Sequence, residues 1–150
     1  MNLNISNRLA ITLGEGSVTP ILDRLFKDNQ VQLLEFAPML SVATKEAQIV
    51  HEDEHSFAVL FKANGYVGRA IDQVAQEYPE ASIELNSANS ITHSTIIRWM
   101  HGERASTVNL DGMDAVRNYF TVVNPGLNAL DYGYDPLTFE QLPTPQPAAS

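Results

Sequence analysis

The chain has 150 residues, of which 44% are hydrophobic and 18% are charged, so it is long enough to bury one good core and has the composition of a folded soluble protein. Its formal net charge is −9, from 9 Lys and Arg against 18 Asp and Glu, which argues against a general nucleic-acid binder because that affinity comes mostly from neutralising phosphates. The absence of cysteine excludes disulfides and thiolate metal sites.

No apolar run approaches the length of a membrane-spanning helix. Residues 1–9 have neither the basic start nor the apolar core of a signal peptide. We therefore expect a cytoplasmic protein without a membrane partner.

The first part of the chain predicts a small mixed or helical module. Residues 1–16 alternate only in part, which predicts a short strand or an ordered arm. Ser17-Val-Thr-Pro20 is typical of a helix start, and the apolar spacing after it predicts a short helix. The apolar stretch 31–42 contains Pro38, so it forms either a kinked helix or two short pieces.

The acidic run His51-Glu-Asp-Glu-His55 separates the apolar stretches 47–50 and 57–61. A hairpin with a charged tip fits this pattern, and so does a helix that starts near Glu52. The run also matches His-Glu-x-x-His, in which two histidines one helical turn apart bind zinc while the Glu acts as a general base. The middle positions of such helices are usually uncharged, so we interpret the run as a solvated tip without a functional metal. We expect no cofactor and no enzymatic activity.

Gly65 is the clearest internal break. It divides the chain into a module over 1–64, which offers a dimer surface, and a helical domain over 65–123. Residues 124–150 then form an aromatic and Pro-rich segment, whose end we expect to be disordered.

The middle part predicts four helices. Apolar residues recur at helical spacing from Tyr66 to Tyr78 and again from Asn109 to Phe120. A short helix is expected over Ala81–Glu84 and a further one over 92–101. The last of these carries Ile96, Trp99 and Met100 at i, i+3 and i+4, which puts them on one apolar stripe, and Gly102 is expected to stop it.

This order of pieces resembles the Cro/CI-type, or XRE-type, helix-turn-helix family of transcriptional regulators over residues 66–123. The resemblance is strongest in Ile91-x-x-Ser94-Thr95-Ile96-x-Arg98-Trp99-x-x-Gly102-x-Arg104. It implies a mainly α fold, a lambda-repressor-like helix-turn-helix bundle that follows the N-terminal module. It also implies a sequence-specific DNA-binding regulator, more often a repressor than an activator, that binds double-stranded DNA at a palindromic operator through the helix 92–101.

The resemblance also implies which side chains contact DNA, in the major groove or along the backbone. These are Ser82, Thr92, His93, Ser94, Thr95, Ile97, Arg98, His101 and Arg104. Two positions depart from the family, which favours a small residue at Asn86 and Gly at Ser90. The charge over 66–123 is also poor for DNA binding, since four Arg against seven acids give −3.

Such regulators usually form homodimers, and the apolar side chains of residues 1–64 are the natural dimer surface. These side chains are Leu33, Leu34, Phe36, Met39 and Leu40. A protein partner could also bind through 127–139. The alternative function is an acidic interaction or adaptor protein, or a phage-type inhibitor, that binds a protein and not DNA.

Overall fold

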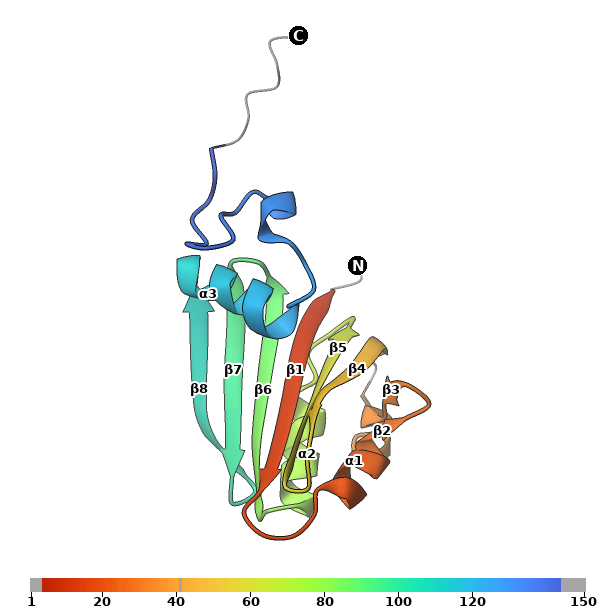
Figure 1. Cartoon of the computed structure of the whole chain (residues 1–150). Helices are drawn as coiled ribbons and strands as arrows, with labels where there is room; N and C mark the ends of the chain where they lie inside the picture. The colour runs from red at the N-terminus through yellow and green to blue at the C-terminus, as the bar shows by residue number, and fades with distance from the viewer. Residues whose placement is uncertain (1–3, 41, 144–150) are drawn as a thin grey trace.

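Six antiparallel strands form the main sheet of the computed structural model, which describes residues 4–40 and 42–143 (Figure 1). The order across the sheet is β4-β5-β1-β6-β7-β8. The strands are β1 Ile5–Leu13, β4 Thr44–Glu52, β5 Ser56–Ala63, β6 Ala81–Ser90, β7 His93–Met100 and β8 Glu103–Asp111. A small second sheet pairs β2 Phe26–Lys27 with β3 Gln30–Val31. The predicted mainly α helix-turn-helix fold is therefore wrong, and the protein has an α+β fold.

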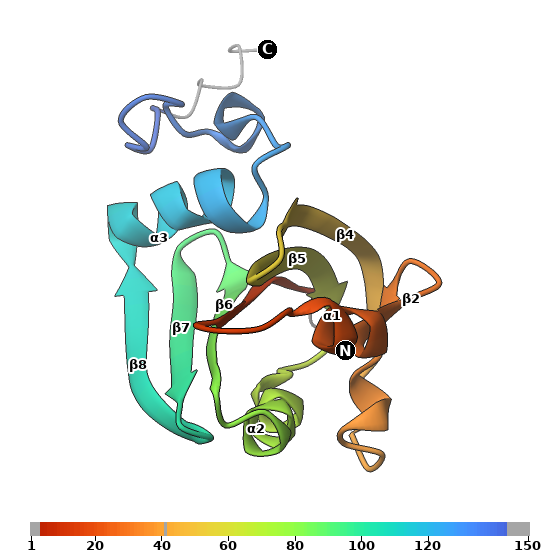
Figure 2. The same cartoon turned by 60° about the horizontal axis from the view of Figure 1, so that its bottom comes forward.

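One face of the sheet, here called the covered face, packs against the main core. Alternation along β1 places Leu9, Ile11 and Leu13 on this face, where they are buried. Helices α1 (Thr19–Leu25) and α2 (Gly68–Glu77) supply the other side of the core. Figure 2 shows both helices on this side of the sheet.

The opposite face, here called the open face, is covered only at one end. There α3 (Gly112–Asn118) and the π-helical turn η2 (Tyr119–Val123) lie across the strand ends (Figure 1). Asn118 fixes α3 to the sheet, because its buried amide exchanges two hydrogen bonds with Asn86 of β6 and donates a third to Ser94 of β7.

The chain after η2 packs back on the body. Phe120 contacts the rings of Tyr132 and Tyr134, and Phe139 is buried in the same small core. Tyr132 ends the 3-10 helix η3 (Ala129–Tyr132). The disorder expected at the extreme C-terminus concerns residues beyond 143, which lie outside the described part of the chain.

The helix expected over 92–101 is wrong because this segment is the strand β7, hydrogen-bonded on both sides. β7 pairs with β6 and with β8, so the short helix expected over Ala81–Glu84 is wrong as well. Gly102 does not stop a helix. It follows His101 in a two-residue turn between β7 and β8, with φ of 57° at His101 and 80° at Gly102, and two positive φ values define the type I′ hairpin turn.

Other predicted elements are confirmed. The helical spacing from Tyr66 to Tyr78 corresponds to α2, the alternation before Gly14 corresponds to β1, and the acidic run is the tip of the β4–β5 hairpin.

The break at Gly65 falls inside a shared sheet, because β1 hydrogen-bonds with β5 on one side and with β6 on the other.

The apolar stretch 31–42 is divided between the core and the surface. Leu33, in the 3-10 turn η1 (Leu33–Glu35), and Phe36 are buried in the main core. Leu34 is 54% exposed and Met39 is 93% exposed. Two of the five side chains expected at a dimer surface are therefore buried in the fold itself, and Leu40 packs against the same core.

Candidate functional site

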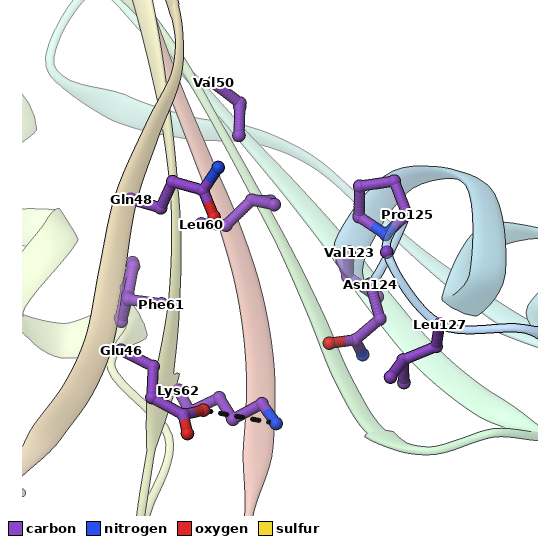
Figure 3. Close-up of a pocket in the computed structure, with 11 residues that line it drawn as sticks. Glu46, Gln48, Val50, Leu60, Phe61, Lys62, Val123, Asn124, Pro125 and Leu127 are labelled. Atoms are coloured by element: carbon purple, nitrogen blue, oxygen red, sulfur yellow. Dashed lines mark ion pairs between the residues drawn. The ribbon is translucent and has the colours of Figure 1, made fainter.

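One cavity of the described residues lies between the open face and the segment that follows η2. Its volume is about 390 Å³, and one wall is formed by β4 and β5 while the other is formed by residues 123–127. Figure 3 shows Asn124, Pro125 and Leu127 facing Gln48 and Leu60 across this space. We call it the first cavity.

Polar groups at the two walls of the first cavity differ in how well they are satisfied. Glu46 and Lys62 form an ion pair of 3.3 Å at one end. The side-chain Nδ2 of Asn124 is buried, yet it has no hydrogen-bond partner among the described residues. A buried donor without an acceptor costs about 1–3 kcal/mol, so this wall of the cavity is held less firmly than the one that carries the ion pair.

A second cavity of about 320 Å³ lies on the same face over β1, β6 and β7. Its lining includes Arg8, Thr12, Ser82 and the ion pair in which Arg98 Nε donates to Glu84 Oε2 at 2.9 Å. The two cavities adjoin, because Arg8 of β1 lies directly opposite Leu60 of β5 in the sheet. The two cavities and the residues between them, which together involve five of the six strands, are here called the trough.

Arg8 stands at the centre of this trough. It is half-buried, and it has neither a hydrogen bond nor a carboxylate within ion-pair distance among the described residues. Lys62 and Arg98, which lie on either side of it, are neutralised by Glu46 and Glu84. Within the described part of the chain, the trough thus carries one guanidinium without a carboxylate partner, a group suited to bidentate binding of a carboxylate or phosphate.

The residues predicted to contact DNA do not share a surface. Alternation along β7 puts Ser94 and Arg98 on the open face and Thr95 and Ile97 on the covered face. His93 and His101 lie at the two ends of β7, roughly 26 Å apart along an extended chain instead of about 12 Å along a helix. The predicted recognition helix is therefore wrong, and DNA binding by these residues stays a prediction without the helix on which it depended.

Several of these side chains have structural partners instead. Ser94 is buried and accepts a hydrogen bond from Asn118. Thr95 donates to Asn109 of β8 at 3.0 Å, and Thr92 is bonded to His93 at 3.1 Å in the turn before β7. Ser82 is exposed in the second cavity. Ser82 and Arg98 are the two predicted DNA-contact residues that line the trough.

Arg104 fixes α2 to the sheet together with Trp99. Arg104 Nε and Nη2 donate to the two carboxylate oxygens of Asp72 at 2.7 and 3.0 Å, and Trp99 Nε1 donates to Asp72 Oδ1 at 2.7 Å. Burial favours the neutral acid, but the bonds from Arg104 and Trp99 outweigh it and hold the pKa of Asp72 below its ordinary value.

The two histidines of the acidic tip do not converge on a shared ligand position. His51 Nε2 lies 2.8 Å from Ser56 Oγ, and His55 Nδ1 lies 2.7 Å from the carbonyl oxygen of Gly16. Among the described residues, no three His, Asp or Glu side chains are grouped so as to hold a metal ion.

The trough residues escaped the sequence reasoning because their neighbours come from distant parts of the chain. The alternation Arg8-Leu-Ala-Ile-Thr12 carried one usable signal, since its even positions are the polar or small ones that face outward. Nothing in the sequence indicated that Asn124 would face β4 and β5.

Comparison with family models, with curated proteins and with solved structures found no match to this chain. The geometry of the trough must therefore carry the functional argument by itself. Within the described residues, no helix is both long enough and apolar enough to cross a membrane.

Proposed function

We propose that this protein is an adaptor that binds an extended peptide segment of a partner protein in the trough on its open face. The observation that carries the proposal is the pair of adjoining cavities on a sheet face that α3 and η2 cover at only one end. Such sites are concave, mainly apolar and carry a few convergent polar groups.

The polar groups of the first cavity are complementary to a peptide backbone. Gln48 and Asn124 stand on opposite walls, and each carboxamide offers both a donor and an acceptor. The side-chain oxygen of Asn124, which points toward the opposite wall in Figure 3, would accept from a main-chain N–H of the bound segment.

Exposed apolar side chains along the trough favour a partner with apolar residues of its own. Val50 of β4 is 42% exposed and Met100 of β7 is 48% exposed, and both line the cavities. Leu60 and Leu127 add aliphatic surface between the walls. Burying apolar area of this kind is the main driving force for association.

Charge favours an acidic residue in the same segment. Arg8 is the one guanidinium of the described trough without a carboxylate partner, whereas the chain as a whole carries −9. A net charge of that sign opposes long arrays of phosphate, as in a nucleic acid, but leaves one local contact with a carboxylate favourable. A cytoplasmic location belongs to the same proposal and is compatible with the absence of cysteine.

Panning a random peptide library against the whole chain tests the proposal. We expect enrichment of peptides that combine apolar residues with an acidic one. Arg8→Ala should weaken binding of an enriched peptide roughly 10- to 150-fold in fluorescence polarisation, since a hydrogen bond to a charged group contributes about 1.5–3 kcal/mol. The matched control is Arg69→Ala, because Arg69 is exposed on α2, on the far side of the sheet.

Two results would contradict the proposal. One is the absence of any enriched peptide, and the other is an equal loss of binding in both arginine variants. Selection of duplexes from a random DNA pool should run in parallel, because recovery of a symmetric operator would favour the regulator prediction over the adaptor.

A further inference from the structure

β8 is an outer strand of the sheet and is exposed along almost its whole length. Eight of its nine residues are exposed, and Leu110 is half-buried. Its inner edge is bonded to β7, while no strand of the described chain lies along its outer edge. The outward backbone N–H and C=O groups of such a strand are a template for pairing with another strand.

The two edges of the sheet differ in how they are protected. The other edge, β4, is interrupted by two register shifts, has a positive φ of 56° at Glu46, and carries charges along its length. These features prevent edge-to-edge association. β8 has its single register shift near its start, and residues 105–110 contain neither a charge nor a proline.

We propose that β8 pairs with β8 of a second copy of this chain, antiparallel and about a two-fold axis at Val108. Residues opposite each other in an antiparallel pair point to the same face. With Val108 on the axis, Thr107 lies opposite Asn109 of the second copy, and Ser106 lies opposite Leu110 of the second copy. Each of these pairs meets that condition, since Thr107 and Asn109 share the covered face and Ser106 and Leu110 share the open face.

Charges at the ends of β8 are complementary in this arrangement. Ala105 lies opposite Asp111 of the second copy, and Arg104 is its immediate neighbour. In the register of β8 with β7, Arg104 lies opposite Trp99 and Asp111 lies opposite His93. Both charged side chains are therefore on the covered face. Arg104 keeps its bonds to Asp72 through Nε and Nη2, so it meets Asp111 of the second copy as a nearby opposite charge and not as a new hydrogen-bond donor.

Glu103, the other acid of β8, does not interfere at this end. Glu103 pairs with Met100 and therefore lies on the open face, away from Asp111 of the second copy. The two-fold axis makes each favourable contact twice. It also joins the two sheets into one, with both open faces on the same side. This inference does not depend on the proposed function, because β8 lines neither cavity of the trough.

The natural absence of cysteine allows a direct test by crosslinking. Val108→Cys places one thiol on the proposed axis. Opposite Cα atoms in an antiparallel pair are about 4.5–5.5 Å apart, which a disulfide can span. Under mild oxidation we expect most of this variant to become a covalent dimer. The matched control is Val50→Cys, at a position of nearly equal exposure on β4, and it should stay monomeric.

Analytical ultracentrifugation of the unmodified chain supplies the second measurement. We expect twice the 16.5 kDa monomer mass at micromolar concentration, and the monomer mass for Val108→Lys with an unchanged circular dichroism spectrum. A monomeric wild type would overturn the inference, as would equal crosslinking of the two cysteine variants. A dimer that survives Val108→Lys would overturn it as well, since another surface would then hold the copies together.

Discussion

Asp72 is the acceptor on which the packing of α2 against β7 depends, and replacing it with alanine should destabilise the protein measurably. Trp99 is 1% exposed, and without Asp72 its indole N–H loses its acceptor in the core, which costs about 1–3 kcal/mol. The ion pair with Arg104 is partly solvated, with side chains 44% and 31% exposed, so it adds only about 0–1 kcal/mol. The expected total loss is about 1–4 kcal/mol, most of it from Trp99.

Urea unfolding followed by intrinsic fluorescence measures this loss, and Trp99 is the only tryptophan of the chain. A chain of this length should also lose about 2–4 °C in Tm for each kcal/mol. Arg104→Gln is the control, because it removes the ion pair but leaves the acceptor of Trp99 in place, and it should cost at most about 1 kcal/mol. The reasoning fails if Asp72→Ala costs no more than Arg104→Gln.

Three further predictions concern other parts of the molecule. Asn118→Ala should lower the free energy of unfolding by about 1–3 kcal/mol in urea titrations, because the buried amide of Asn86 loses its partner; a neutral effect would show that α3 is not held there. Gly102→Ala should cost about 1–2 kcal/mol because φ is +80°, whereas Gly14→Ala, with open space around its Cβ, is the control and should be near neutral. The pKa of Asp72 is lowered in the folded state, so its ionisation stabilises the protein at pH values above the ordinary pKa of 3.8, and this contribution is lost as the pH falls below that value. The difference in unfolding free energy between wild type and Asp72→Asn should therefore be constant near neutral pH and shrink below about pH 4. A difference that grows in acid would contradict the assignment.

The helix–strand error over 92–101 has a physical cause. Three apolar residues at i, i+3 and i+4 fit a helix, but Ile97 and Trp99 also alternate with Arg98 and Met100 as a strand requires. The run Thr95-Ile-Ile97 is β-branched and favours a strand, and the His-Gly dipeptide fits a hairpin turn as well as a helix end. Whether a short segment of this kind forms a helix or a strand is decided by its pairing with the neighbouring strands β6 and β8, which the pattern of the segment itself does not show.

Local patterns predicted α2, which depends on local contacts, and left β1 and the β4–β5 hairpin as one of two alternatives each. The strand order could not be predicted from one sequence, because it places β1 between β5 and β6, at sequence separations of some fifty to eighty residues. The same limit applies to Arg8, Leu60 and Asn124 in the trough. Asn86 is instructive, since its mismatch with the regulator family is explained by its buried bonds to Asn118.

Hydrogen–deuterium exchange on the protein saturated with an enriched peptide tests the central claim most directly. The account predicts slower exchange in β4 and in residues 123–127, which form the two walls of the first cavity, and unchanged exchange in α1 and α2 on the covered face. Protection confined to α1 and α2, or unaltered exchange at both walls, would show that the trough is not where this protein binds its partner.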